Sequence, residues 1–281
     1  MQMMLLYIKE QLRDYYPESE IKSFYYLIME SVCRLDKQSV LLGKDTQISP
    51  NEKRMIEEMV EDLRKFRPIQ YILGETEFYG LKFKLNERVL IPRPETEELV
   101  ERVLNGCTVH GTRCRMLDVG TGSGCIAVAL AKFLSGAEVY ALDISEKALE
   151  VASENARNNR VNVRFIRHDI FEDLPENLPE QFDVIVSNPP YITPVEKEIM
   201  SKNVLDYEPH QALFVPQEKP LLFYERIADV ARNRLKDSGK LYFETSAVYG
   251  KEAAEMLKKK GFGSVRLFKD ISGKDRVLVA D

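Results

Sequence analysis

Apolar side chains in the first part of the chain recur at the three- and four-residue spacing of amphipathic helices. The series begins with Leu5, Ile8 and Leu12 and continues with Ile21, Phe24, Tyr25, Ile28, Ile56, Met59, Val60 and Leu63. Ser49 precedes Pro50, which is the order of an N-cap and a first helical residue. The pattern predicts a domain of several short helices over residues 1–75.

After this region the spacing of apolar residues becomes that of short strands. The apolar residues Phe78, Leu81, Phe83 and Leu85 are spaced as in a strand, and they are followed by the polar residues Asn86-Glu87-Arg88 and the apolar residues Val89-Leu90-Ile91. This order predicts a β-hairpin linker over residues 76–92 with its turn around residues 86–88. Prolines then end the strand, and the acidic residues 95–98 suit the first turn of a helix.

From residue 115 onward, short apolar runs alternate with amphipathic helical stretches. The runs that we predict as strands are Met116–Val119, Val139–Leu142, Val163–Ile166, Val184–Ser187, Lys240–Glu244, Val265–Phe268 and Arg276–Ala280. Helices are predicted near Gly124–Leu134, Ser145–Asn158, Pro220–Leu235 and Tyr249–Lys260. This alternation predicts an α/β domain over residues 93–281 with a doubly wound parallel sheet. Because the last two strands follow each other directly, we expect an antiparallel edge.

The composition places the chain among soluble globular proteins. It has 281 residues, a length at which two domains are common, with 44% hydrophobic and 30% charged residues. No stretch approaches the roughly 18 to 20 uncharged apolar residues of a membrane-spanning helix, and the apolar run Met3–Ile8 is too short for a signal peptide. We therefore expect a cytoplasmic protein without a membrane partner. The four cysteines follow no pairing pattern and are interpreted as free thiols.

The charge argues against a nucleic-acid partner. The chain has 40 Lys and Arg against 45 Asp and Glu, a net charge of −5, and residues 1–90 carry 14 basic and 15 acidic side chains. Proteins that bind a nucleic-acid backbone normally carry a basic excess. We expect no direct nucleic-acid contact, and we interpret the basic run Lys258–Lys260 as a solvated helix end before Gly261.

A glycine-rich segment follows the first predicted strand of the α/β domain, where an open α/β sheet binds its ligand. The segment reads Asp118-Val-Gly-Thr-Gly-Ser-Gly-Cys125. Alternating glycines let a ligand approach the backbone and leave N–H groups unblocked. A dinucleotide-binding loop would have glycine in place of Cys125, and a nucleoside-triphosphate loop would continue with Gly-Lys-Ser/Thr, so the segment matches neither.

An acidic residue ends the next predicted strand. Asp143 stands 19 residues after Gly124. A carboxylate at this place accepts hydrogen bonds from the two hydroxyls of a ribose. Glycine loop and acid together predict a ligand that contains adenosine but has no pyrophosphate.

This combination resembles the S-adenosylmethionine site of class I methyltransferases, whose sheet has seven strands with the last one antiparallel. The resemblance implies a Rossmann-like fold for residues 93–281, S-adenosylmethionine as the cofactor and S-adenosylhomocysteine as the product. It also implies that Asp143 binds the ribose, that Asp169 binds the adenine amino group and that Ile170, which is aromatic in several relatives, lies beside the adenine. The residues that it places near the methionine part of the cofactor are Gly120, Thr121, Gly122, Ser123 and Gly124.

The tetrapeptide Asn188-Pro189-Pro190-Tyr191 follows the fourth predicted strand and indicates methyl transfer to a planar nitrogen. An amide or aromatic amine is a poor nucleophile because its lone pair is delocalised. The Asn188 side-chain oxygen and the Pro189 carbonyl can accept both N–H groups, which favours a pyramidal nitrogen aimed at the methyl group. Successive prolines fix φ and donate no competing N–H, and Tyr191 offers a flat wall. No strong base is needed, since the methylated nitrogen loses its proton easily.

Further segments resemble the HemK/PrmC family, whose members methylate the glutamine in the Gly-Gly-Gln motif of peptide chain release factors. The segments are Pro68–Gly74, Phe78–Gly80, Val89–Glu97, Tyr207–Pro209 and Lys269–Arg276. The resemblance implies a release factor as protein substrate. We expect a monomeric enzyme in which the helical domain and the hairpin help to recognise the release factor, because a pocket for one side chain would accept any exposed glutamine. It places Arg93–Glu97 over the methionine end of the cofactor. The residues that it assigns to the acceptor glutamine are Asn188, Pro189, Pro190, Tyr191 and Leu90. Where the family usually has glycines, this chain has Val215-Pro216.

Three other features are assigned no catalytic role. Cys107, His110 and Cys114 have the spacing of a metal half-site, but the sequence offers no second cluster, and we predict no bound metal. Cys125 is interpreted as a small packing residue. His168 and His210 are interpreted as structural or peripheral, because the chemistry above requires no base.

Two other functions stay open. A nucleic-acid amino methyltransferase would use the same Asn-Pro-Pro-Tyr geometry, but it would have to flip a base and would need a basic surface. A nucleotide-dependent oxidoreductase or a non-catalytic adenosine sensor is the second alternative. Cys125 argues against the oxidoreductase, and the intact segment 188–191 argues against the sensor.

Overall fold

The computed structural model describes residues 2–41, 47–107 and 114–281. Within these ranges the chain forms two compact units. The helical unit consists of Met1–Gly74 together with Ser201–Tyr207, and the sheet unit consists of Glu75–Met200 and Glu208–Asp281.

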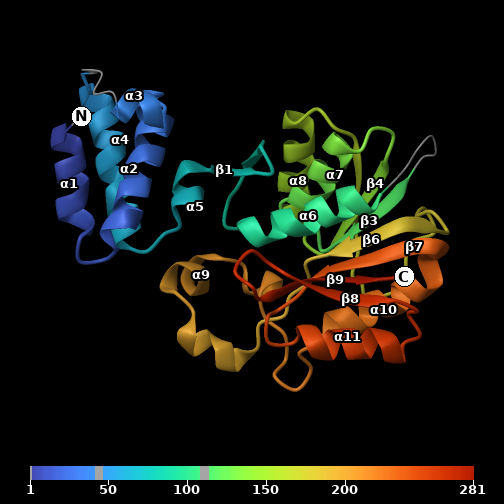
Figure 1. Ribbon diagram of the computed structural model, residues 1–281. Helices are drawn as coiled ribbons and strands as arrows, with labels where there is room; N and C mark the ends of the chain where they lie inside the picture. The colour runs from blue at the N-terminus through green and yellow to red at the C-terminus, as the bar shows by residue number, and fades with distance from the viewer. Residues whose placement is uncertain (1, 42–46, 108–113) are drawn as a thin grey trace. The chain divides into compact units, whose positions relative to one another are not determined.

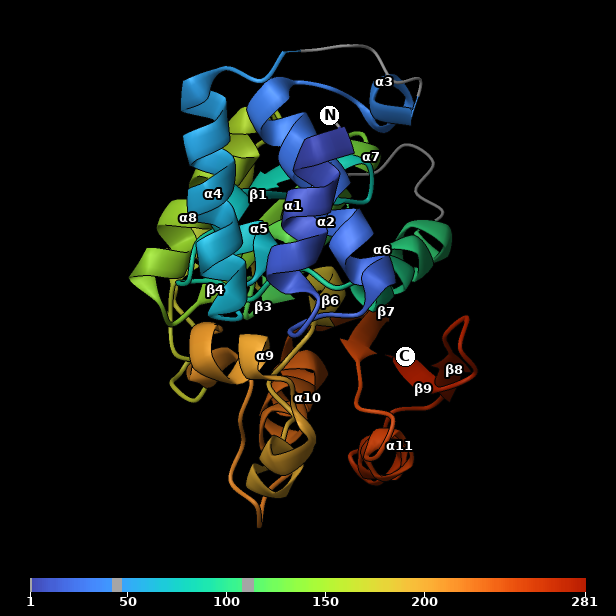
Figure 2. The same ribbon diagram turned by 90° about the vertical axis from the view of Figure 1, so that its left-hand side faces the viewer.

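The helical unit confirms the helical pattern of the sequence. Its helices are α1 (Gln2–Leu12), α2 (Glu18–Cys33), α3 (Lys37–Leu41), α4 (Pro50–Arg64), α5 (Ile69–Leu73) and α9 (Lys202–Tyr207). Helices α1, α2 and α4 pack side by side, as Figures 1 and 2 show. Their shared core contains side chains with no exposed surface, among them Ile8, Leu12, Ile28, Ile56 and Leu63.

Two features of the helical unit fix its local geometry. The Ser49 hydroxyl accepts the Glu52 N–H at 3.3 Å while the Glu52 carboxylate accepts the Ser49 N–H at 2.7 Å, so the expected start of α4 is a capping box. The second feature is α9, which comes from a distant part of the chain. The Tyr207 hydroxyl donates to the Lys65 carbonyl at 2.9 Å, and the Lys202 ammonium lies 5.3 Å from the Phe66 ring centre.

The hairpin is present, but its strands are joined at Tyr79-Gly80 and not at residues 86–88. Strands β1 (Glu75–Phe78) and β2 (Leu81–Lys84) pair antiparallel across Tyr79-Gly80. Both turn residues have positive φ, 51° and 71°, which suits the tight twist of a two-residue hairpin loop. The predicted turn at residues 86–88 exists, with the Val89 N–H donating to the Asn86 carbonyl at 3.2 Å, but it joins no pair of strands because residues 89–91 are not a strand. The sequence misled because Tyr79 is not a residue type that favours positive φ.

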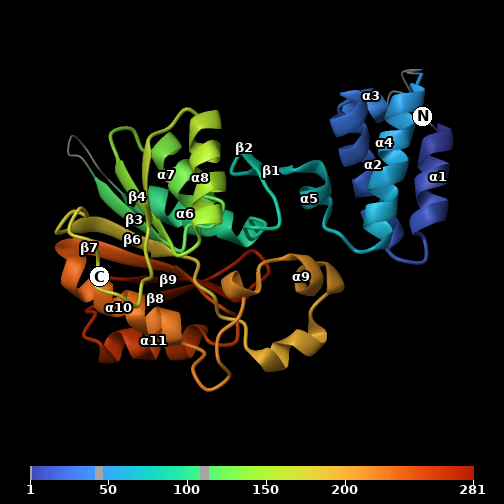
Figure 3. The same cartoon turned by 180° about the vertical axis from the view of Figure 1, so that it is seen from behind.

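The sheet unit confirms all seven predicted strands. In the described residues they lie in the order β5-β4-β3-β6-β7-β9-β8. Their bounds are β3 (Arg115–Val119), β4 (Glu138–Asp143), β5 (Val163–Arg167), β6 (Phe182–Ser187), β7 (Leu235–Glu244), β8 (Val265–Lys269) and β9 (Asp275–Ala280). Helices α6 (Pro94–Gly106), α7 (Cys125–Phe133) and α8 (Glu146–Asn158) cover one face, and α10 (Leu222–Arg234) and α11 (Gly250–Lys259) cover the other (Figures 1 and 3). The short 3₁₀ segments Pro194–Ile199 and His210–Ala212 lie between β6 and α10.

The expected antiparallel edge of the sheet is confirmed, and the structure adds the order of its strands. Strand β9 is antiparallel to both β7 and β8, and it lies between them, so β8 forms the edge of the sheet. The burial of the two strands explains the order. Residues Val277–Ala280 of β9 are all buried, whereas every residue of β8 is half-buried or exposed. A continuous apolar run is typical of an interior strand, and mixed polarity is typical of an edge.

The sheet positions the site at one end. Strands β3, β4, β5, β6 and β7 run parallel, so their carboxyl ends meet at the same edge of the sheet. Among the described helices, none is long and apolar enough to cross a membrane.

Candidate active site

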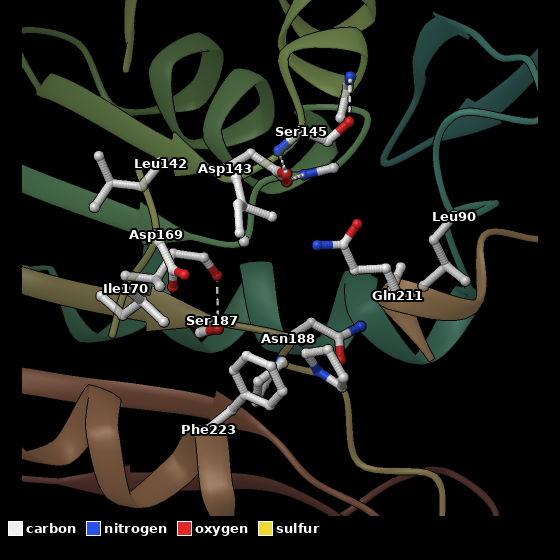
Figure 4. A pocket seen from close by; sticks show the side chains of 18 of the residues that line it. Leu90, Leu142, Asp143, Ser145, Asp169, Ile170, Ser187, Asn188, Gln211 and Phe223 are labelled. Atoms are coloured by element: carbon white, nitrogen blue, oxygen red, sulfur yellow. Dashed lines mark hydrogen bonds between the residues drawn. The ribbon is translucent and has the colours of Figure 1, made fainter. Parts of the chain in front are cut away.

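A cavity of about 330 Å³ lies at the carboxyl ends of the parallel strands. Its wall is formed by the loop after β3, the ends of β4, β5 and β6, and the segments 88–90 and 209–212. Figure 4 shows Asp169 and Ile170 at one end of the cavity, Leu90 and Gln211 at the other, and Asp143 and Asn188 on facing sides between them. Open parallel sheets bind ligands in this position.

The glycine loop after β3 has a backbone that only glycine adopts without strain. Gly120, Gly122 and Gly124 have φ values of 73°, 55° and 80°. A side chain at Gly120 or Gly122 would meet nothing within 4 Å, but one at Gly124 would lie 2.9 Å from the Ala152 Cβ of α8. Gly120 and Gly122 are therefore required for their backbone conformation, whereas Gly124 also allows α7 and α8 to approach each other.

The loop N–H groups are not unblocked, contrary to our expectation. The N–H groups of Gly120 and Thr121 both donate to the Leu142 carbonyl at 2.9 Å, and that of Gly122 donates to Asp143 Oδ2 at 2.8 Å. The end of β4 therefore accepts the loop N–H groups that would otherwise bind a phosphate. The loop is built to hold a ligand without a pyrophosphate, which argues against a dinucleotide oxidoreductase.

Asp143 is held in place by backbone donors and faces the cavity. Its Oδ2 accepts from Gly122, and its Oδ1 accepts from the Ser145 N–H at 2.9 Å (Figure 4). Burial raises the pKa of Asp143, and the backbone hydrogen bonds oppose that rise. A carboxylate offers about four lone-pair directions, so two remain for hydroxyl groups of a ligand.

The far end of the cavity combines one acid with apolar side chains. Asp169 Oδ1 accepts the Phe171 N–H at 3.0 Å, and Ile170 is 8% exposed. Phe171 and Phe223 also line this end, with their ring centres 5.2 Å apart. The expected aliphatic wall at Ile170 is therefore supplemented by aromatic rings that sequence reasoning missed. Phe223 belongs to α10 and no motif marks it; only the folded sheet brings it to this place.

The Asn-Pro-Pro-Tyr segment leaves β6 at the floor of the cavity. The Ser187 hydroxyl donates to the Val119 carbonyl at 2.7 Å, which joins the ends of β6 and β3. Asn188, Pro189 and Pro190 line the cavity. Tyr191 packs against the hydrophobic core on the α10 side, and its hydroxyl lies 3.5 Å from Glu244 Oε1.

An ion pair between a buried glutamate and a half-buried arginine connects two parts of the cavity rim. Glu208 is 3% exposed; it accepts the Ile91 N–H at 3.3 Å and pairs with the Arg93 guanidinium. Burial raises the pKa of Glu208, and Arg93 opposes that rise. The pair holds the segment that contains Leu90 beside the segment that begins at Pro209. Nearby, the unusual Val215 is buried and its N–H donates to the Ile192 carbonyl at 2.9 Å, so the valine stabilises the loop rather than lining the cavity.

Four predicted residues, all within the described ranges, lie behind the cavity wall. The Thr121 hydroxyl donates to Asp118 Oδ2 at 2.6 Å, and burial raises the pKa of Asp118 to about 7. The Ser123 carbonyl accepts from Asn155 at 2.9 Å. Gly124 contacts α8 and Tyr191 faces the core, as described above. These residues shape the loop and the turn, while Gly120, Gly122, Asp143, Asp169, Ile170, Asn188, Pro189, Pro190 and Leu90 line the cavity.

His168 and Gln211 line the cavity, although sequence analysis placed neither of them there. His168, interpreted there as structural or peripheral, follows β5 and is half-buried at the wall. Gln211 projects its amide into the space opposite Asn188 (Figure 4). In the sequence, only the position of Gln211 two residues after the segment Tyr207–Pro209 indicates that it lies near the site.

The cysteines set aside in the sequence do not line this cavity. Cys125 is buried, and burial raises the pKa of its thiol to about 12, as for a packing residue. Cys107 and Cys114 lie within hydrogen-bonding contact of each other, while His110 falls outside the described residues. Within the ranges that the structure describes, no group of three or more His, Cys, Asp and Glu side chains could hold a metal ion.

Comparison with known proteins decides the family. A model of the methyltransferase domain matches residues 110–269, and a model of the PrmC N-terminal domain matches residues 4–74. The release factor glutamine methyltransferase of Flavobacterium psychrophilum is 45% identical over 96% of this chain and 94% of its own length. The chain belongs to the release factor glutamine methyltransferase family. The family member from Bacteroides thetaiotaomicron is likewise 45% identical, over 98% of each chain.

The fold agrees with this family. A solved methyltransferase from Pyrococcus furiosus shares it with a TM-score of 0.52, covering 83% of this chain and 98% of its own, at 19% identity. The family that the motifs predicted is confirmed, and with it the class I methyltransferase fold.

The polar groups of the cavity fit S-adenosylmethionine, the cofactor predicted for a release factor glutamine methyltransferase. Asp143 has acceptor capacity left for two ribose hydroxyls, and Asp169 with Ile170 and the two phenylalanine rings suits an adenine. The occupied loop N–H groups suit a ligand that carries no phosphate. The two carboxylates and the apolar wall of the cavity are therefore groups that suit this cofactor.

Proposed function

We propose that this protein transfers a methyl group from S-adenosylmethionine to the side-chain amide nitrogen of the glutamine in the Gly-Gly-Gln motif of peptide chain release factors. The observation that carries the proposal is the meeting of Asn188-Pro189-Pro190 with Asp143 in one cavity, in a chain that belongs to the release factor glutamine methyltransferase family. The first group suits an amide acceptor, and the second suits an adenosine cofactor.

The cofactor supplies an electrophilic methyl group on a sulfonium sulfur. The protein has to place the amide nitrogen in line with it, and we assign that task to the Asn188 side-chain oxygen and the Pro189 carbonyl. Each accepts one N–H of the acceptor, so that the nitrogen lone pair is drawn out of the amide plane. Pro190 fixes the turn, and Tyr191, which anchors the turn in the core, keeps the two acceptors at a constant spacing.

Asn188→Ala tests this assignment at the level of a single residue. Removal of the side-chain acceptor should lower kcat by a factor corresponding to roughly 2 to 4 kcal/mol, as for loss of a hydrogen-bond partner of a transition state. Cofactor affinity, measured by calorimetry, controls for collapse of the site. A kcat equal to that of the wild type would contradict the role of Asn188.

The acceptor itself is tested with labelled cofactor and two purified release factors. One carries the natural Gly-Gly-Gln motif, and the other has the glutamine replaced by asparagine, which shortens the side chain by one methylene. Label should enter only the first. Equal labelling of both would refute glutamine as the acceptor, and label in added DNA or RNA instead would favour the amino methyltransferase of nucleic acids.

We further propose that the helical unit recognises the folded release factor. Its α1 presents two exposed apolar side chains one turn apart, Met3 at 83% and Leu6 at 61% exposure, which suits a protein partner. Met3→Ser and Leu6→Ser should reduce methylation of the whole release factor but not of a short peptide with the Gly-Gly-Gln motif. Equal loss on both substrates, or no loss on either, would contradict this role.

The remaining proposals concern the setting of the reaction. We propose that the enzyme acts as a monomer in the cytoplasm and without a direct nucleic-acid contact. The net charge of −5 and the near balance of charges over residues 1–90 support the absence of a nucleic-acid clamp. Sedimentation of the free enzyme would test the monomeric state, and its elution with and without tRNA would test the absence of a nucleic-acid contact.

A further inference from the structure

Behind Asn188, on the side away from the cavity, a chain of hydrogen bonds leads into the core. The Asn188 side-chain NH₂ donates to Thr96 Oγ1 at 3.4 Å, and the Thr96 hydroxyl donates to Glu244 Oε2 at 2.6 Å. The Tyr191 hydroxyl lies 3.5 Å from the other carboxylate oxygen, Glu244 Oε1. The chain thus joins both ends of the Asn-Pro-Pro-Tyr turn to the first turn of α6 and the end of β7.

The direction of this chain matters because an asparagine side chain has two different ends. Turning the amide of Asn188 by 180° exchanges its oxygen and its NH₂, and the two orientations have nearly the same shape. Only the orientation with NH₂ on Thr96 leaves the oxygen free for another partner. The opposite orientation would present a donor to the cavity and repel an N–H group of the acceptor.

Thr96 can select the orientation because a hydroxyl has a single proton. While that proton is donated to the Glu244 carboxylate, Thr96 Oγ1 has only lone pairs to offer its other neighbour. Asn188 must then approach with its NH₂. If Glu244 were protonated, it could donate to Thr96, and the Thr96 proton would be free to point at the Asn188 oxygen.

Burial makes this selection effective. Thr96 and Glu244 are each 2% exposed, so water does not replace the hydrogen bonds between them. Burial raises the pKa of Glu244 to about 7, while Thr96, Arg276 and Tyr191 oppose the rise and Glu95 adds to it. The other titratable groups that face Glu244 are Tyr224 of α10, whose hydroxyl donates to the Glu244 carbonyl at 3.1 Å, and Cys125 of α7.

We propose that Thr96 and Glu244 are positioning residues for methyl transfer: the ionised Glu244 accepts the hydrogen bond of the Thr96 hydroxyl, and Thr96 in turn holds Asn188 with its oxygen toward the acceptor nitrogen. The inference rests on the proposed function of Asn188. It adds that the orientation of the amide is set by a carboxylate two hydrogen bonds away. It also makes the ionisation of Glu244 a condition for activity.

The test uses three variants of the full-length enzyme. Thr96→Val removes the hydroxyl at nearly constant volume, Thr96→Ser keeps it, and Glu244→Gln keeps the shape but removes the charge. For each we would measure kcat and KM on a release factor, cofactor affinity by calorimetry, and the pH profile of kcat between about pH 6 and 8.5. Unfolding curves establish that each variant is folded.

Thr96→Val should lower kcat by roughly tenfold or more, with cofactor affinity within about twofold of the wild type, because a buried orienting partner is lost. Thr96→Ser should restore most of kcat. In the wild type kcat should rise with pH as Glu244 ionises, and this rise should be absent from Glu244→Gln. If Thr96→Val does not fold, the serine variant and the two pH profiles decide.

The inference is overturned if Thr96→Val has the kcat of the wild type, or if Thr96→Ser is as impaired as Thr96→Val. It is also overturned if Glu244→Gln keeps both the rate and the pH dependence of the wild type. Failure of the proposed function has a different signature, because the wild-type enzyme in the same assay would then transfer no methyl group to the release factor glutamine.

Discussion

Asp143→Asn is the substitution whose effect the structure defines most closely. The two carboxylate oxygens of Asp143 accept the N–H groups of Gly122 and Ser145, at 2.8 Å and 2.9 Å. An asparagine has only one acceptor oxygen, so its NH₂ would face one of these two donors. One backbone N–H at the edge of the cavity would lose its partner, and one potential acceptor for the cofactor would disappear.

The magnitude follows from these two losses. A buried donor without a partner costs about 1 to 3 kcal/mol, and hydrogen bonds to a charged acceptor exceed those to a neutral one by about 1 to 2 kcal/mol. Burial already raises the pKa of Asp143, so removal of the charge relieves part of the cost of burying it. We expect the free energy of unfolding to fall by about 1 kcal/mol, and the cofactor Kd to rise about 10- to 100-fold.

Isothermal titration calorimetry with S-adenosylhomocysteine measures the affinity, and urea unfolding measures the stability. Asp173→Asn is the matched control, because it makes the same chemical change at an exposed aspartate of the sheet unit. The control should bind like the wild type. A Kd for Asp143→Asn within about twofold of the control would refute the assignment of Asp143 to the cofactor.

Three further predictions concern stability. Gly124→Ala should lower the free energy of unfolding by about 1 kcal/mol because of its positive φ, and by a further 1 to 3 kcal/mol because of the close contact with Ala152. The control Gly136→Ala, with a φ of 85° and nothing within 4 Å, should lower it only by the first amount. Equal losses in urea unfolding would contradict the contact between the helices. Ser49→Ala should cost about 1 kcal/mol through loss of the capping box, and an unchanged unfolding curve would speak against it. Burial raises the pKa of Glu244 from 4.5, the value of a carboxyl in water, to about 7 in the folded protein, so its contribution to stability is full below pH 4.5 and is lost as the pH rises to 7. The free energy of unfolding of the wild type minus that of Glu244→Gln should therefore fall from pH 5 to pH 8, and a difference that grows with pH would contradict the raised pKa.

The strands and the glycine loop could be predicted because their signals are local. Runs such as Val139–Leu142 are continuous, lie between helical patterns and become central strands of a parallel sheet. Gly120, Gly122 and Asp143 follow such strands directly, and the carboxyl ends of parallel strands meet by construction. The site could therefore be located before the order of the strands was known.

The parts that escaped prediction depend on contacts between distant residues. Thr96 and Glu244 are 148 residues apart and meet only when α6 packs across the end of β7. The place of β9 between β7 and β8 is a choice of pairing partner, which strand periodicity alone does not contain. Helix α9 has only six residues, and its packing in the helical unit involves the Tyr207 hydroxyl and a backbone carbonyl rather than an apolar stripe.

The hairpin shows a different limit. Its turn requires positive φ at two successive residues, and the sequence places Tyr79 at one of them. A tyrosine pays a conformational cost there that its surroundings offset, since its N–H donates to Glu97 at 2.7 Å and its ring packs edge-on to Phe133. Local propensity predicts the polar turn at residues 86–88 instead, because it contains no information about those two partners.

The most direct test of the proposed function is to map the methylated atom. The wild-type enzyme would be incubated with S-adenosylmethionine, a purified release factor and an excess of DNA and RNA, and every product would be analysed by tandem mass spectrometry. The account predicts a single new methyl group on the side-chain nitrogen of the glutamine in the Gly-Gly-Gln motif. A methyl group on a nucleobase amine, or on another residue of the release factor, would contradict it.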